Sequence, residues 1–209
     1  MIRRVSLAAL ALLMVVPLVA QSPKGWMVRA DRSTSASDPD GAGAIKFVQA
    51  GSGFQATNPQ AAVFWNPANT VTGNYSLKGS FTLLKPSGHP NFYGLVFGGA
   101  DLGGAAQTYT YFMVAQDGTW LIKQRAGDAT SNVAPKGASD LVKKPDASGK
   151  STNALEVRVM GDKIDYLVNG TVVHSTPKAG PTAKTDGIYG IRVNHLLDVQ
   201  VDGLTAAKQ

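Results

Sequence analysis

The sequence predicts an all-β fold, built as a sandwich or barrel of antiparallel strands. Apolar and polar residues alternate with a two-residue period in most segments after residue 25, as expected for strands with one buried face. Turn dipeptides such as Asp117-Gly118 and Asn169-Gly170 separate several of these segments and supply the positive φ angles of short hairpins. No segment after the first twenty residues has a convincing helical period. Regularly spaced short strands of this kind are typical of sandwiches and barrels.

The first half of the chain supplies several short strands and one central strand. Leu77, Phe81 and Leu83 fall on one face of a strand, so this face should be core. The segment 92–99 is apolar on both sides and should therefore be a central strand. The strands expected in this half cover 26–30, 45–48, 53–57, 62–65, 74–85 and 92–99.

The second half begins with the clearest hairpin in the middle of the chain, which turns at Asp117-Gly118. The long segment 127–151 has no hydrophobic periodicity, and we interpret it as an insertion or as a mobile lid. The strands expected in this half cover 107–115, 119–125, 153–160, 163–168, 171–174, 187–195 and 197–204.

Length and composition are consistent with a single domain. With 209 residues and 44% hydrophobic side chains, the chain can form one sizeable core. We expect residues 21–209 to form one β-sandwich, with its core at about 25–205. The sequence has no cysteine, so the domain depends on its core and not on disulfides.

Residues 1–20 have the pattern of a secretory signal peptide. A short basic segment precedes an apolar run from Val5 to Val19, and Ala20 offers a small residue for cleavage. We therefore expect export to the periplasm or the extracellular space. The alternative is an uncleaved N-terminal anchor, although about 15 apolar residues are fewer than the roughly 20 that span a bilayer. No membrane span is expected in the mature chain.

Several longer segments together resemble the concanavalin A-like jelly-roll superfamily. The resemblance covers about residues 25–205 and is nearest to the laminin-G-like and secreted sugar-hydrolase-like branches of that superfamily. It implies two antiparallel sheets, one of which is concave and collects the residues of a binding site. The segments that carry it are Pro90 to Gly99, Tyr109 to Trp120, Asn153 to Val159, Val168 to Gly170 and Gly187 to Val193.

The single glutamate argues against a glucanase. Glycoside hydrolysis usually needs two carboxyl groups across the scissile bond, and the jelly-roll enzymes that resemble bacterial laminarinases carry two glutamates on one strand. This chain has only Glu156, which alternates with Leu155 and Val157 and should face solvent beside Arg158. If the protein were an enzyme of the sugar-hydrolase-like branch, Glu156, Asp198 or His195 would be the acid or base.

A sugar-binding face is our leading hypothesis. Aromatic rings suit the CH faces of sugars, and guanidinium, ammonium and amide groups suit their hydroxyl or carboxylate groups. The alternative is that the two tyrosines are core, that the two cations of the following strand only solubilise the sheet, and that His195 stabilises a turn. The candidate ligand-binding residues are Tyr109, Tyr111, Lys123, Arg125, Arg192, Asn194 and His195.

A metal site has little support from the sequence. Asp101 and Asp117 lie in loops where laminin-G-like domains often hold calcium, which prefers oxygen ligands. Zinc is disfavoured because the histidines His89, His174 and His195 are isolated and cysteine is absent. We therefore expect no cofactor, with calcium as the possible exception.

Taken together, the sequence favours an exported, non-catalytic domain that binds a carbohydrate or a glycan-bearing surface. A sugar-hydrolase-like enzyme and a protein-interaction or structural module are the two alternatives. The net charge of +6 is mild and spread along the chain, so we expect no nucleic-acid partner. The sequence does not determine the oligomeric state.

Overall fold

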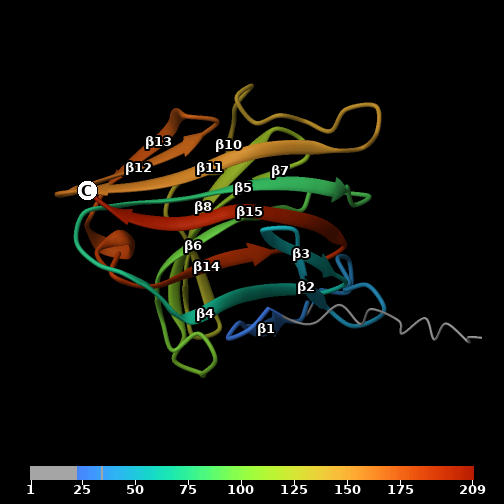
Figure 1. Ribbon diagram of the computed structural model, residues 1–209, viewed down its shortest axis with the longest axis horizontal. Coiled ribbons are helices and arrows are strands. Elements are labelled where there is room, and N and C mark those ends of the chain that lie inside the picture. Colours follow the sequence, from blue (N-terminus) through green and yellow to red (C-terminus); the bar gives the residue numbers. More distant parts are fainter. Residues whose placement is uncertain (1–22, 34) are drawn as a thin grey trace, which may run out of the picture.

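The computed structural model describes residues 23–33 and 35–209. Within these residues the fold is all-β, with strands β1 to β15 and one short 3-10 helix, η1 (Gly180–Thr182). Two antiparallel sheets stack into a sandwich, as the sequence predicts (Figure 1). The expected signal peptide lies outside the described residues. No helix in the described part of the chain is long and apolar enough to cross a bilayer.

The first sheet, which we call sheet A, contains the hairpin expected in the middle of the chain. Strand β9 (Ala129–Asn132) pairs with β8 beside the end of the sheet. The order of the other strands is β1 (Met27–Asp31), β4 (Ala61–Val71), β14 (Gly187–Val193), β6 (Phe92–Ala100), β7 (Thr108–Ala115), β8 (Thr119–Ala126) and β10 (Gly137–Ala138).

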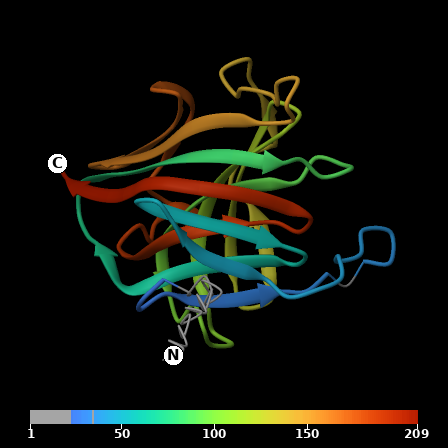
Figure 2. The same cartoon turned by 45° about the vertical axis from the view of Figure 1, so that its right-hand side comes forward.

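The second sheet, sheet B, takes most of its strands from the other parts of the chain. Strands β1 and β2 are edge strands of the two sheets and lie on the same side of the molecule, so the segment 32–45 crosses from one sheet to the other (Figure 2). The strand order in sheet B is β13 (Thr171–Pro177), β12 (Lys163–Val168), β11 (Ser151–Met160), β5 (Tyr75–Lys85), β15 (Leu197–Lys208), β3 (Gly53–Asn58) and β2 (Lys46–Ala50).

The main core lies between the sheets and follows the predicted alternation. Leu77, Phe81 and Leu83 of β5 are fully buried in it, which confirms their shared core face. Strand β6 is buried on both faces, because Leu95 belongs to the main core and Val96 to a second apolar cluster. The prediction of a central strand at 92–99 is therefore correct.

The second apolar cluster covers the outer face of sheet A, the face that points away from sheet B. Its buried members come from β4, β6, β7, β8 and the loop after β6, so several strands contribute to it. The cluster consists of Val63, Trp65, Val96, Leu102, Tyr109, Tyr111, Met113 and Leu121. Part of the outer face of sheet A is therefore apolar and buried.

Segment 127–151 is not the mobile lid that is one interpretation of the sequence, and the other interpretation, an insertion, stays a prediction. It contains the short strands β9 and β10, and Ala134 and Val142 are buried in the main core. The backbone of Lys143 exchanges two hydrogen bonds with the side chain of Asn153, at 2.8 and 3.1 Å. The side chain of Asn169, in the β12–β13 turn, donates to the carbonyl of Leu141 at 2.7 Å. The segment is therefore packed against the sandwich as part of the fold.

Strand β4 is also longer than expected and passes through Asn66 and Pro67. Its register with β14 shifts between Trp65, which pairs with Gly190, and Thr70, which pairs with Ile188. The proline is therefore accommodated in an irregular stretch where it need not donate a ladder hydrogen bond.

Two buried tyrosines of the core provide a matched test of this packing. The hydroxyl of Tyr75 donates to the carbonyl oxygen of Thr185 at 2.7 Å, whereas the buried hydroxyl of Tyr93 has only weak contacts, with the side chains of Ser151 and Asn153. Burial, followed by the charge of Asp186, raises the pKa of Tyr75 above its ordinary value, so its hydroxyl stays protonated near neutral pH.

We expect Tyr75→Phe to lower the free energy of unfolding by about 1 kcal/mol, because it removes a hydrogen bond and leaves a buried carbonyl without that donor. Tyr93→Phe should cost less, because the buried hydroxyl that it removes makes no hydrogen bond of normal geometry among the described residues. Urea denaturation of both variants measures the difference. A larger loss for Tyr93→Phe than for Tyr75→Phe would contradict this packing.

Candidate functional site

Strand β14 brings the predicted ligand-binding residues into one region of sheet A. It lies between β4 and β6, so Arg192 pairs with Val63 on one side and with Gly94 on the other. Strands β7 and β8 pair Tyr109 with Arg125 and Tyr111 with Lys123. Because side chains of one strand face alternate sides, these residues share the outer face.

The carboxylate of Asp31 lies at the centre of a group of arginines, which we call the arginine cluster: Arg29, Arg125 and Arg192. Arg192 donates a hydrogen bond to Asp31. Arg125 and Arg29 approach the same carboxylate at 3.7 and 3.9 Å. The side chains of Asp31 and Arg192 are only 8% and 9% exposed, so this is a largely buried ionic network. Three cations share one carboxylate, which leaves an excess of positive charge.

The two tyrosines support this network and are not exposed platforms. Arg192 donates to the hydroxyl of Tyr109 at 2.9 Å, and its guanidinium lies 5.4 Å from the centre of the Tyr111 ring. Residues Tyr109 and Tyr111 are 1% and 5% exposed within the second apolar cluster. The expectation that their rings stack on a sugar is therefore wrong for this conformation, because both rings are buried among other side chains and Arg192 lies over the ring of Tyr111.

Charge and burial fix the protonation of this network. Burial raises the pKa of Tyr109 to about 12, although the charge of Arg192 opposes the shift. For Arg192 burial acts to lower the pKa, but attraction to Tyr109 and Asp31 raises it above its ordinary value overall. At neutral pH Arg192 is therefore charged and Tyr109 is a neutral hydroxyl.

A polar pocket of about 160 Å³ opens where β1 and β14 end, and we call it the rim pocket. The oxygen Oδ1 of Asn194 is buried there without a hydrogen-bond partner among the described residues. Of the predicted ligand-binding residues, Arg192, Asn194 and His195 line it. Its full lining is Asp31, Ser33, Asp38, Asp40, Ala61, Asn91, Arg192, Asn194 and His195.

His195 is held inside the rim pocket by carboxylates. Its Nδ1 lies 3.3 Å from Oδ1 of Asp40, and its Nε2 lies 3.1 Å from Oδ1 of Asp38. The ring of His89 lies beside it, with the two Nε2 atoms 3.4 Å apart. The prediction that the histidines are isolated is therefore wrong for this pair. The pairing of Val193 with Tyr93 places the ends of β14 and β6 together, and both histidines lie just beyond those ends.

Sequence reasoning missed the acidic side of the pocket. Asp38 and Asp40 lie in a polar segment that looks like an ordinary loop, and Asp31 ends a short edge strand. The one available signal was the spacing of three aspartates within ten residues, but nothing local indicates that this segment folds over the end of β14. Asn91 was missed for the same reason.

The residues considered for an enzyme do not converge. Glu156 accepts hydrogen bonds from Ser76 at 2.7 Å and from Arg158 at 3.0 Å. Asp198 accepts from Gln55 and Thr57 at 2.9 and 3.2 Å and lines a different pocket of about 670 Å³. Glu156 pairs with Lys78 in the middle of sheet B and lines neither that pocket nor the rim pocket that contains His195. Glu156 therefore cannot act on the same bond as His195.

The aspartates considered for calcium are also separated. Asp101 accepts a hydrogen bond from the backbone of Ala106 in the loop before β7, and Asp117 accepts one from Thr119 in the turn after β7. Strand β7 runs between them, so they lie at opposite ends of an eight-residue strand and cannot share one ion. Calcium binding at either loop stays a prediction.

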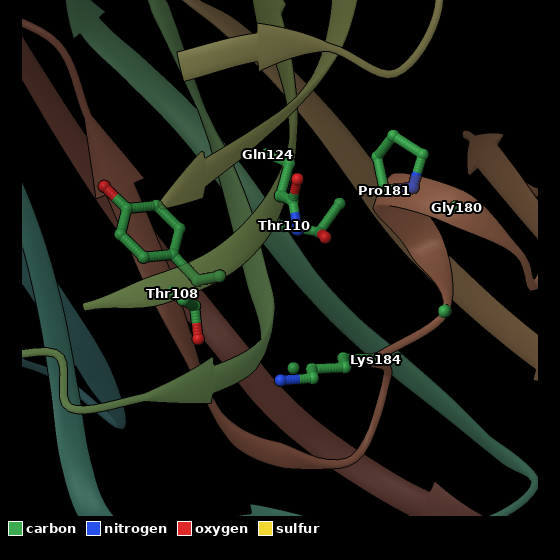
Figure 3. Close-up of a pocket in the computed structure, with 9 residues that line it drawn as sticks. Thr108, Thr110, Gln124, Gly180, Pro181 and Lys184 are labelled. Carbon is green, nitrogen blue, oxygen red and sulfur yellow. The ribbon is translucent and has the colours of Figure 1, made fainter. Parts of the chain in front are cut away.

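A further pocket of about 160 Å³ lies near η1. Thr110 and Gln124 lie side by side in it, across from Pro181, and Lys184 extends below them in the view (Figure 3). Of the predicted ligand-binding residues only Tyr109 lines this pocket. The rim pocket combines more of the predicted residues with both signs of charge, and it is our candidate site.

The fold is that of the concanavalin A-like jelly rolls. The carbohydrate-binding module CBM66 from Bacillus subtilis is similar over 88% of this chain and 96% of its own, with 12% identity and a TM-score of 0.61. A Bacteroides ovatus mixed-linkage glucan GH16 protein, solved with a G4G4G3G product, is similar over 90% of this chain and 97% of its own, with 9% identity and a TM-score of 0.59.

A Bacillus subtilis protein of unknown function with a galectin-like fold is 14% identical and covers 89% of this chain and 91% of its own, with a TM-score of 0.56. No family model and no curated protein matches the sequence. At these identities the similarity establishes the fold, and the fold is shared by binding modules and glycoside hydrolases.

The buried network suggests a direct test of the site's architecture. Asp31→Asn removes the only carboxylate within 4 Å of Arg192 among the described residues, so we expect a loss of about 3 kcal/mol in the free energy of unfolding. The matched control is Asp128→Asn, because Asp128 also pairs with Arg125 at 3.8 Å but its side chain is 99% exposed. The control should show no measurable change by urea denaturation. Equal effects of the two substitutions would contradict the buried network.

Proposed function

We propose that the protein is an exported β-sandwich that binds a carbohydrate or a glycan-bearing surface through the rim pocket without catalysing a reaction. The observation that carries the proposal is the convergence of Arg192, Asn194, His195 and three aspartates on one small pocket. Sugar hydroxyl groups both donate and accept hydrogen bonds, so they need such a mixture of partners.

The size of the pocket supports a small polar ligand unit. Its volume of about 160 Å³ is below the roughly 300–1,000 Å³ of pockets for drug-sized molecules. We infer that it takes one sugar residue at the end of a chain and not a long segment of polysaccharide. Asn194 lines the pocket and its Oδ1 has no hydrogen-bond partner among the described residues, so a small side-chain rotation would offer an acceptor to a sugar hydroxyl.

The similar solved structures support the same reading. They include a carbohydrate-binding module and a glycoside hydrolase of the same fold. The single glutamate and the separation of Glu156 from Asp198 and His195 favour binding over glucanase chemistry.

A hydrolase-like enzyme is the second candidate, because one observation favours it. The Nδ1 atom of His195 faces the carboxylate of Asp40 at 3.3 Å, an arrangement in which a carboxylate orients a histidine for proton transfer. In that case His195 would be the general base and Arg192 would stabilise developing negative charge.

A thermal-shift and calorimetry screen of oligosaccharides tests the binding proposal. A glycan that binds the native state at 100 times its Kd should add about 2.7 kcal/mol to the free energy of unfolding. We expect saturable stabilisation that is lost in Asn194→Ala. The matched control is Asp198→Asn in the separate 670 Å³ pocket at the start of β15, which should keep it.

The opposite pattern, with binding lost in Asp198→Asn only, would place the ligand in the other pocket. Release of free sugar that disappears in His195→Ala would establish the enzyme instead. Absence of stabilisation by any glycan in a broad screen would favour the protein-interaction module.

The export proposal has its own test. After expression in a bacterium, mass spectrometry of the purified protein should find a mature chain that begins at Gln21, in the periplasm or the medium. Leu12→Arg places a charge in the apolar run and should leave the full-length chain in the cytoplasm. A full-length chain in the membrane fraction would support the uncleaved anchor.

A further inference from the structure

We propose that Asp38, His89 and His195 bind a divalent transition-metal ion of the Zn²⁺ type at the edge of the rim pocket. These three residues are the only His, Cys, Asp or Glu group of metal-binding geometry in residues 23–33 and 35–209. The metal site shares Asp38 and His195 with the rim pocket, but metal binding has a readout without any glycan and can be tested separately from sugar binding.

The distances between the three candidate ligand atoms fit a tetrahedral ion. Oδ1 of Asp38 lies 2.9 Å from Nε2 of His89 and 3.1 Å from Nε2 of His195. The two Nε2 atoms are 3.4 Å apart. Ligand atoms about 2.0–2.2 Å from a tetrahedral zinc are roughly 3.3 Å from one another, so small adjustments would place an ion between the three.

The surroundings of His195 are compatible with a bound ion. Both ring nitrogens of His195 face carboxylate oxygens, at 3.1 and 3.3 Å. With an ion at Nε2, Nδ1 can donate to Asp40 while Nε2 and Asp38 both bind the ion.

Asp40 would be an outer-shell partner of the ion, because it faces the second ring nitrogen of His195. Carboxylates that accept the second N–H of a metal-binding histidine fix the orientation of its ring. Asp40 is itself held in place, because its Oδ2 accepts a hydrogen bond from the backbone of Ser33 at 2.9 Å. This arrangement would keep Nε2 of His195 directed at the ion.

The exposure of the three side chains allows an ion to enter, and their donor atoms favour a transition metal. The side chain of His195 is 7% exposed, whereas those of His89 and Asp38 are 46% and 48% exposed, so an ion can enter from solvent. Two imidazoles and one carboxylate suit Zn²⁺ and its neighbours, and Ca²⁺ and Mg²⁺ prefer oxygen ligands. The fourth position would face the rim pocket, which Asp38 and His195 both line.

Titration of the full chain without a histidine tag tests this proposal. Calorimetry with Zn²⁺ should give one ion per chain, and Co²⁺ should give the visible absorption bands of tetrahedral coordination. Ca²⁺ should not compete. We expect at least a 100-fold weaker Kd for Zn²⁺ in His89→Ala and in Asp38→Asn, whose exposed side chains can be replaced without disturbing the core.

Two further variants distinguish the ligands from their surroundings. Asp40→Asn should keep one site per chain with about 10- to 100-fold weaker affinity, as for an outer-shell partner. The matched control is His174→Ala, because that histidine is outside the proposed site and its ring centre lies 5.1 Å from that of Trp120. It should leave the affinity unchanged.

The proposal is overturned if the wild-type chain does not bind Zn²⁺, if Ca²⁺ binds equally well, or if His89→Ala binds Zn²⁺ as tightly as wild type. Glycan binding in the absence of Zn²⁺ would leave the proposed function standing, so failure of one proposal can be told from failure of the other.

Discussion

The candidate site depends on the antiparallel pairing of β14 with both β4 and β6. This pairing inserts a strand from near the end of the sequence into the middle of sheet A. The same register pairs Arg192 with Val63 and Val193 with Tyr93. The last residue of β14 therefore lies beside the start of β6. A slip by one residue would turn Arg192 toward the core and separate His195 from His89.

The arginine cluster places charged side chains in a largely buried and partly apolar environment. Asp31 and Arg192 are largely buried on a sheet face that also carries the second apolar cluster. Desolvation of such a pair opposes folding, and the pair is maintained because each partner is bonded and because the hydroxyl of Tyr109 accepts a further bond. The tyrosines thus keep a cation at the base of a solvent-accessible pocket.

The sequence predicted what is local and missed what is long-range. The shared face of Leu77, Phe81 and Leu83 and the turn at Asn169 follow from a few adjacent residues, and the structure contains both. The contact of His89 with His195 depends on a strand pairing across about a hundred residues, which alternation does not encode. Burial of Tyr111 likewise depends on a residue far along the chain, because Arg192 of β14 lies over its ring. Ala134 and Val142 are isolated buried residues of segment 127–151. Because they form no repeating pattern, the sequence did not predict their burial.

The central positions of β14 and β15 also constrain how the chain can fold. Each sheet is completed only when one of the last two strands enters between partners from much earlier in the sequence, β4 and β6 in one case and β3 and β5 in the other. Contacts between residues so far apart form slowly, because a large loop must close first. A growing chain would therefore expose unpaired strand edges until β14 and β15 are made, and such edges favour aggregation during that interval.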